Sequence, residues 1–130
     1  MKSIVVDTDI LIDYSNAKSE WLEEMLTKSV ARQPLVLSVV TISEFLAADQ
    51  FEKEIEKLKF GKVLKLFRLQ DYNLEIAEIV GKLLRQKKKF SGISFPDLVI
   101  AATAIYLKAP LATRNLSHFQ GIPDLELFKP

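Results

Sequence analysis

The sequence predicts an α/β fold, in which helices cover both faces of a mostly parallel sheet. Short apolar runs rich in β-branched residues alternate along the chain with segments whose apolar residues recur at helical spacing. The 130 residues, of which 48% are hydrophobic and 27% charged, are enough for one globular core. We therefore expect a single domain over residues 1–130.

The first strands are expected near the N-terminus. Residues 4–6 (IVV) form an apolar run typical of a buried central strand, and residues 35–37 (LVL) form a second one after Pro34. Between these runs a helix is predicted from apolar residues at helical spacing: Trp21, Leu22, Met25, Leu26 and Val30.

The middle of the chain predicts a helix followed by a third strand. The helix is expected to begin at Thr41, because Thr41 and Glu44 have the spacing of a capping box. Gly61 is the expected stop, and a short strand is expected within residues 63–69. The helical stripe between them consists of Phe51, Ile55 and Leu58.

The last third predicts two helices and two strands. One helix is expected from Asp97 to Leu107, with Ser94 as its N-cap and Pro110 as the residue that ends it. Its residues are almost all apolar or small, so it should be buried on most sides. Short strands are expected at residues 111–113 and 125–127. The other helix precedes Asp97 and is amphipathic; its apolar face consists of Ile76, Ala77, Val80, Leu83 and Leu84.

Composition excludes several classes of protein. The absence of cysteine rules out disulfides and thiolate metal sites, and the single histidine, His118, cannot build a zinc site of the usual kind. No apolar run approaches the roughly 18 residues of a membrane span, and Met1 leads straight into a strand-like segment. We expect a cytoplasmic protein without a membrane partner.

Charge leaves nucleic-acid binding open. The net charge is only +1, but binding follows local patches rather than the total. One basic cluster occurs, and it fits either a solvated helix end or a contact with nucleic acid. Its members are Arg85, Lys87, Lys88 and Lys89.

Three carboxylates lie where strand and helix ends would bring them together: Asp7, Glu44 and Asp97. Each also has a local explanation, because Asp7 suits a turn and the other two suit first turns of helices. Two like charges about 4 Å apart repel by roughly 4 kcal/mol at an effective dielectric of 20. Three acids at one point therefore predict a divalent cation, and oxygen ligands favour Mg²⁺ or Mn²⁺.

Further polar residues are expected beside these acids. Asp9 is an expected outer ligand or metal-approach residue, whereas Asp13 suits a turn or a helix start. The segment after the strand at 111–113 supplies Thr113, Arg114, Asn115 and His118. Arg114 suits phosphate, Asn115 can donate and accept, and His118 suits a base, a phosphate donor or a packed turn residue.

Four segments together resemble the PIN-domain nucleases, most closely the small prokaryotic VapC toxins. They are residues 5–12 (VVDTDILI), 38–45 (SVVTISEF), 97–104 (DLVIAATA) and 111–119 (LATRNLSHF). Each segment is short, but their order and spacing cover essentially the whole chain. The resemblance implies a three-layer α/β/α sandwich around a parallel sheet.

The resemblance also implies Mg²⁺- or Mn²⁺-dependent endoribonuclease activity, with Asp7, Glu44 and Asp97 as the metal-binding acids and Thr8 as a supporting hydroxyl. It implies a homodimer and a cognate antitoxin whose segment blocks the acidic cleft, as in a toxin-antitoxin pair. Many members carry a fourth acid in the last segment, where this chain has Asn115 and His118. A neutral residue in place of the fourth acid leaves the site with one negative charge fewer, which disfavours the binding of a second metal ion.

Other classes remain open at this level. The run Asp7-Thr8-Asp9 also resembles the opening motif of haloacid-dehalogenase phosphatases, in which the first aspartate is the nucleophile, but the late acidic pair of that family is incomplete here. A catalytically weak PIN-like module that binds RNA or protein is a second alternative, and a DNA-directed nuclease is a third.

Overall fold

The computed structural model describes residues 3–16, 20, 23, 34–86 and 92–128. Its described strands form one parallel sheet of four, in the order β3-β2-β1-β4. In register, Ile4 lies opposite Leu35, Val5 opposite Leu111 and Val36 opposite Arg68. The strands are β1 (Ile4–Val6), β2 (Leu35–Ser38), β3 (Arg68–Gln70) and β4 (Leu111–Ala112).

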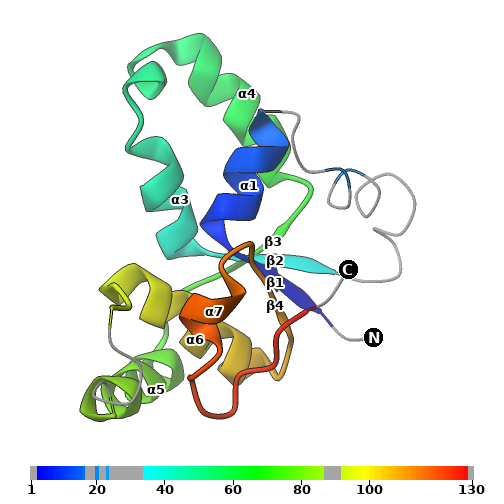
Figure 1. The fold of residues 1–130 in the computed structure, drawn as a ribbon. Coiled ribbons are helices and arrows are strands. Elements are labelled where there is room, and N and C mark those ends of the chain that lie inside the picture. The colour runs from blue at the N-terminus through cyan, green and yellow to red at the C-terminus, as the bar shows by residue number, and fades with distance from the viewer. Residues whose placement is uncertain (1–2, 17–19, 21–22, 24–33, 87–91, 129–130) are drawn as a thin grey trace.

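Helices cover both faces of this sheet (Figure 1). Helices α1, α3 and α4 lie on one side, and α5, α6 and α7 lie on the other, so the predicted three-layer α/β/α sandwich is confirmed. The bounds are α1 (Thr8–Ser15), α3 (Val39–Leu46), the 3₁₀ helix η2 (Asp49–Glu52), α4 (Glu54–Leu64), α5 (Leu74–Arg85), α6 (Phe95–Leu107) and α7 (Leu116–Phe119).

The two faces of β1 explain its continuous apolar sequence. Ile4 and Val6 pack into the core on the side of α1, α3 and α4, whereas Val5 packs into the core on the side of α5 and α6. In β2, Leu35 and Leu37 join the first core and Val36 joins the second. Successive side chains of a strand point to opposite faces, so a strand buried on both sides needs apolar residues throughout.

Helix α6 is the most buried helix in the described part of the chain, as the sequence predicts. Ala101, Ala102 and Ala104 are fully buried, which lets the helix approach the sheet and α5 closely. The helix ends at Lys108, which caps it in the left-handed conformation with φ of 54°. Pro110 therefore lies in the following loop and is not the residue that ends the helix.

Several sequence predictions are wrong in their boundaries. Helix α3 begins at Val39 and not at Thr41, because the Ser38 side chain caps it by accepting from the Val40 amide at 3.2 Å. Gly61 lies inside α4 instead of ending a helix. The third strand occupies Arg68–Gln70 rather than beginning at residue 63.

The C-terminal predictions are met in part. The strand expected at residues 111–113 is β4, whereas the strand expected at 125–127 is reduced to one parallel bridge between Leu111 and Leu127. The helix expected from the stripe at 21–30 and the basic residues 87–89 lie outside the described residues. Among the helices that the structure describes, none is long and apolar enough to cross a membrane.

Candidate functional site

Asp7 follows β1 directly and caps α1. Its Oδ1 accepts from the Thr8 amide at 2.7 Å, and its Oδ2 accepts from the Thr113 hydroxyl at 2.7 Å. Thr113 comes directly after β4, the neighbour of β1, so the parallel pairing brings the two side chains to the same edge of the sheet. Asp7 is only 6% exposed.

Burial makes the negative charge of Asp7 unfavourable. Its pKa is raised from 3.8 to about 7, first by loss of solvation and then by the nearby charge of Asp9, with a smaller contribution from Asp97. The hydrogen bonds from Thr113 and Thr8 act in the opposite direction. A cation at this place would stabilise the charged form of Asp7.

Asp9 approaches Asp7 from the first turn of α1. The Thr113 hydroxyl lies 3.4 Å from Asp9 Oδ2, and the Arg114 amide donates to the same oxygen at 3.2 Å. Burial raises the pKa of Asp9, while the amide and the charge of Arg114 oppose that rise. Because α1 begins at Thr8, the helical turn and not a continued strand places the two aspartates together.

Glu44 projects from α3 and is connected to α1 by hydroxyl groups. The Thr8 hydroxyl donates to Glu44 Oε1 at 2.7 Å and lies 3.1 Å from the hydroxyl of Thr41, which is fully buried. Since α3 starts at Val39, Glu44 lies in its second turn and is not the partner of a capping box. Glu44 is therefore held by the Thr8 side chain of another helix instead of by its own helix start.

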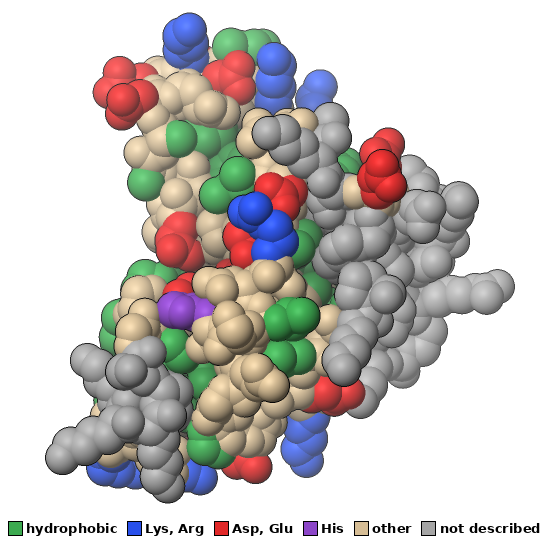
Figure 2. Space-filling view, in the orientation of Figure 1, with side chains coloured by type: hydrophobic (Ala, Val, Ile, Leu, Met, Phe, Trp, Pro, Cys, Tyr) green, Lys and Arg blue, Asp and Glu red, His purple; other side chains and the backbone are tan. Residues whose placement is uncertain are grey.

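Asp97 lies in the first turn of α6, as its sequence position predicts. The Ser94 hydroxyl accepts from the Asp97 amide at 3.3 Å and caps the helix. The Asp97 carboxylate lies 2.9 Å from Nε2 of His118, which belongs to α7. Figure 2 shows the single histidine next to acidic atoms on the left side of the face in view.

The sequence-predicted residues thus gather at one edge of the sheet, but not as a ready metal cage. No group of three His, Asp or Glu side chains within the described ranges has the arrangement of metal ligands. Glu44 is bonded to Thr8 and Asp97 to His118, so the three predicted acids have separate partners. The chemistry of the donors nevertheless fits Mg²⁺ or Mn²⁺, because the carboxylates around Asp7 supply oxygen ligands and excess negative charge.

The remaining predicted residues support this edge. The backbone amide of Asn115 donates to the Thr113 hydroxyl oxygen at 3.0 Å, which helps to fix Thr113 against Asp7. Arg114 forms an ion pair with Asp13, with 2.9 Å between Nε and Oδ2. Asp13 lies within α1 and is neither a turn nor a helix-start residue. No local pattern in the sequence indicates this pairing of Asp13, or that the Thr41 hydroxyl contacts Thr8 instead of capping a helix.

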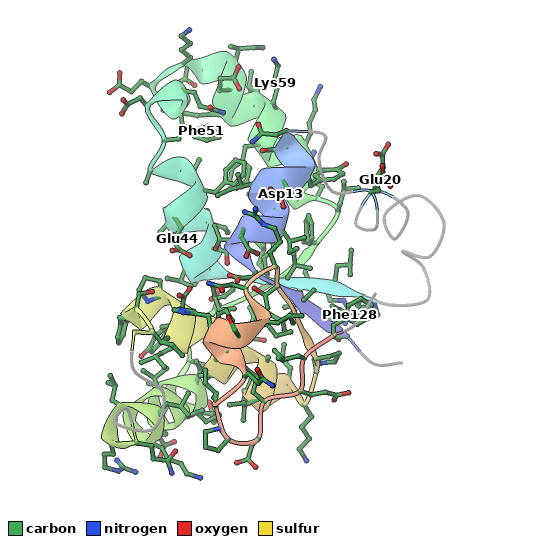
Figure 3. The ribbon with its side chains drawn as sticks, in the orientation of Figure 1. Asp13, Glu20, Glu44, Phe51, Lys59 and Phe128 are labelled. Atoms are coloured by element: carbon green, nitrogen blue, oxygen red, sulfur yellow. The ribbon has the colours of Figure 1, made fainter. Side chains whose placement is uncertain are left out.

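A pocket lies beside Glu44 between α1, α3 and η2. It is lined by Glu44, Phe45, Phe51 and Asn16, among others. Figure 3 shows Glu44 on α3 and Asp13 on the neighbouring α1, with Phe51 and Lys59 farther from the sheet. A second pocket, which shares Asn16, Phe45 and Phe51 with the first, is also lined by Phe60, whose ring stacks on that of Phe45 with centroids 4.5 Å apart.

Residues 4–123 match the family model described as PIN domain. The chain belongs to the PIN-domain family. It is 34% identical over 125 residues to "Ribonuclease VapC1" of Methanocaldococcus jannaschii, covering 95% of this chain and 84% of that relative.

Two solved structures share the PIN-domain fold. One is VapBC2 from Rickettsia felis bound to a promoter DNA fragment, with a TM-score of 0.85, 23% identity and 97% coverage of both chains. The other is VapBC-1 from nontypeable Haemophilus influenzae, with a TM-score of 0.79, 26% identity and coverage of 98% of this chain and 97% of that one. The resemblance to haloacid-dehalogenase phosphatases is thereby limited to the opening motif.

Proposed function

We propose that this PIN-domain protein is a divalent-metal-dependent endoribonuclease and the toxin of a toxin-antitoxin pair. The observation that carries the proposal is the buried carboxylate of Asp7, which is destabilised by Asp9 and Asp97 at the edge of a sheet. A relative named as a ribonuclease aligns over 95% of the chain, which supports RNA as the substrate.

Different residues of the site would bind the metal ion, orient the acids and contact the phosphate. Asp7 and Asp97 would hold Mg²⁺ or Mn²⁺, and Glu44 would bind it directly or through water. Thr8 and Thr113 orient Glu44 and Asp7 through hydroxyl hydrogen bonds of 2.7 Å each. Arg114 would face the phosphate. When bound, the ion would acidify an attacking water and polarise the scissile phosphate.

The test is cleavage of total RNA by the purified protein with Mn²⁺, with Mg²⁺ or with EDTA. We expect cleavage only with a metal, and its loss in Asp7→Asn. The matched control is Asp71→Asn, because Asp71 follows β3 as Asp7 follows β1 but is exposed. Full metal-dependent cleavage by Asp7→Asn would refute the assignment of Asp7.

A second candidate is a catalytically weak PIN-like module that binds RNA or protein. It is favoured by the separate partners of Glu44 and Asp97 and by the lack, among the described residues, of three acids or histidines grouped as metal ligands. Calorimetric titration with Mn²⁺ separates the two candidates, because an inert module should show no specific site that disappears in Asp7→Asn.

The partner of the proposed toxin would be an antitoxin. Similar solved chains come from VapBC assemblies, which supports a cognate protein partner for this chain. We also propose that the protein forms a homodimer. Expression with and without an adjacent small open reading frame, followed by mapping of RNA ends, tests the class and the partner together: growth arrest should be relieved by the neighbour.

A further inference from the structure

Arg114 is held by one face of α1 at two points. Its backbone amide donates to Asp9 Oδ2 at 3.2 Å, and its guanidinium Nε lies 2.9 Å from Asp13 Oδ2. Asp9 and Asp13 are four residues apart on α1, so their side chains lie above one another on the same face. The main chain and the side chain of Arg114 are therefore both oriented by this helix.

The two members of the ion pair differ in exposure. The Asp13 side chain is 17% exposed and the Arg114 side chain is 61% exposed. Asp13 contacts the guanidinium through Nε, and an arginine carries four more N–H donors on its terminal nitrogens. The carboxylate is thus largely enclosed by protein, whereas much of the cation remains accessible to a ligand.

We propose that Asp13 is a positioning residue, which holds Arg114 so that the exposed end of the guanidinium binds a phosphate of the RNA beside Asp7 and Asp9. The inference rests on the proposed function. Planar guanidinium groups match the geometry of phosphate, and a held fork loses less side-chain entropy on binding than a free one.

The fixed cation of Arg114 lies beside the negative charges of Asp7 and Asp9. Arg114 contacts Asp9 directly through its backbone amide, and the hydroxyl of the preceding Thr113 contacts both Asp7 and Asp9. Unscreened carboxylates repel an approaching RNA backbone, and a fixed cation at their edge offsets that repulsion. The Arg114 side chain is 61% exposed, so solvent screens its pairing with Asp13 and we expect the pair to contribute little to folding stability.

The experiment measures single-turnover cleavage of a labelled, single-stranded oligoribonucleotide of mixed sequence in Mn²⁺, with enzyme in excess, at several KCl concentrations. It yields a maximal rate and a half-saturating enzyme concentration for wild type, Asp13→Asn, Asp13→Glu and Arg114→Ala. The control is Glu54→Gln, which removes the carboxylate of an exposed ion pair with Lys57 on α4 (3.2 Å).

We expect Arg114→Ala to raise the half-saturating concentration. The slope of the logarithm of this concentration against the logarithm of the KCl concentration should fall by about 0.7, the value for one phosphate contact on a single strand. Asp13→Asn should lower the maximal rate about tenfold, as losing a supporting partner does, and should raise the half-saturating concentration less than Arg114→Ala does, because the cation is retained but no longer held. Asp13→Glu should recover part of the rate, and Glu54→Gln should match wild type.

Three results would overturn the inference. They are a wild-type maximal rate in Asp13→Asn, an unchanged salt dependence in Arg114→Ala, and a lower unfolding midpoint in Asp13→Asn that accounts for its lost activity and is not relieved by Asp13→Glu. Absence of metal-dependent cleavage by the wild type would instead overturn the proposed function itself, before any variant is compared.

Discussion

The carboxyl group of Asp7 links the stability of the protein to pH. Its pKa is raised from 3.8 to about 7, so between these values the folded chain keeps a proton that the unfolded chain has released. The free energy of unfolding therefore falls as pH rises through this window, by roughly 4 kcal/mol in the absence of metal. Asp9 acts in the same direction because burial also raises its pKa.

Asp7→Asn should remove most of this dependence. The asparagine can still accept from the Thr8 amide, and Thr113 can turn its proton toward Asp9, whose Oδ2 lies 3.4 Å away. We expect the variant to be more stable than wild type at pH 8 in EDTA and similar at pH 4. Urea unfolding at both pH values measures this; equal slopes with pH in the two proteins would contradict the assigned cause.

The Thr8 hydroxyl is expected to fix Glu44 for its proposed role. Thr8→Val has nearly the same shape but leaves Glu44 without its 2.7 Å donor. Loss of such a supporting hydrogen bond should lower cleavage activity about 10- to 100-fold. Thr8→Ser keeps the hydroxyl and should retain most activity. If valine and serine give the same rate in a metal-dependent cleavage assay, the hydroxyl has no positioning role.

At the scale of single elements, the start of α6 places Asp97. Ser94→Ala removes the N-cap and should cost about 1 kcal/mol of unfolding free energy. Asn73→Ala removes the N-cap of α5, in which Asn73 accepts from the Ile76 amide at 2.8 Å, and should cost a similar amount. Only Ser94→Ala should also reduce cleavage, because α5 contributes none of the proposed site residues.

This comparison needs both denaturant unfolding and cleavage rates under conditions where each variant is fully folded. An equal loss of activity in Asn73→Ala would mean that general stability, and not the orientation of Asp97, limits the reaction.

Helix starts also mark where sequence reasoning succeeds and where it fails. Ser94, Pro96 and Asp97 lie in a segment with one good cap, and the predicted start is confirmed. Near Glu44 the chain offers hydroxyls at both Ser38 and Thr41, and the local pattern cannot choose between them. The end of β2 decides, because the strand already stops at Ser38 and leaves its side chain free to cap α3.

Gly61 shows a second limit. A glycine after an apolar stripe is a frequent helix end, but Phe60 packs in the core and α4 continues to Leu64. Packing of the next turn outweighs the low helix propensity of one glycine. The fold class depends on many residues and was predictable, as was the gathering of site residues at one edge. The contact of Asp13 with Arg114 depends on tertiary placement that no local pattern encodes.

At the scale of the whole molecule, we propose that residues 1–130 fold as one cooperative domain, because the central strands β1 and β2 contribute to the cores on both faces. Ala102→Leu tests this proposal. The side chain is fully buried in α6, and overpacking should cost about 1–3 kcal/mol. Ala47→Leu, at an exposed position after α3, is the control and should change stability by less than about 0.5 kcal/mol.

We expect Ala102→Leu to shift one transition that is seen at the same urea concentration by circular dichroism and by tyrosine fluorescence. Two separated transitions in either protein would mean that the layers on the two faces of the sheet unfold independently.

The pairing of β1 with β4 has a consequence for synthesis. The bond between Asp7 and Thr113 joins groups 106 residues apart in sequence, and strand β4 must dock beside β1 before it can form. During synthesis the proposed site therefore stays incomplete until Leu111 to Thr113 have emerged from the ribosome. If the proposed activity is correct, a polypeptide released before that point should leave the RNA of a translation extract intact, whereas the full chain should cleave it.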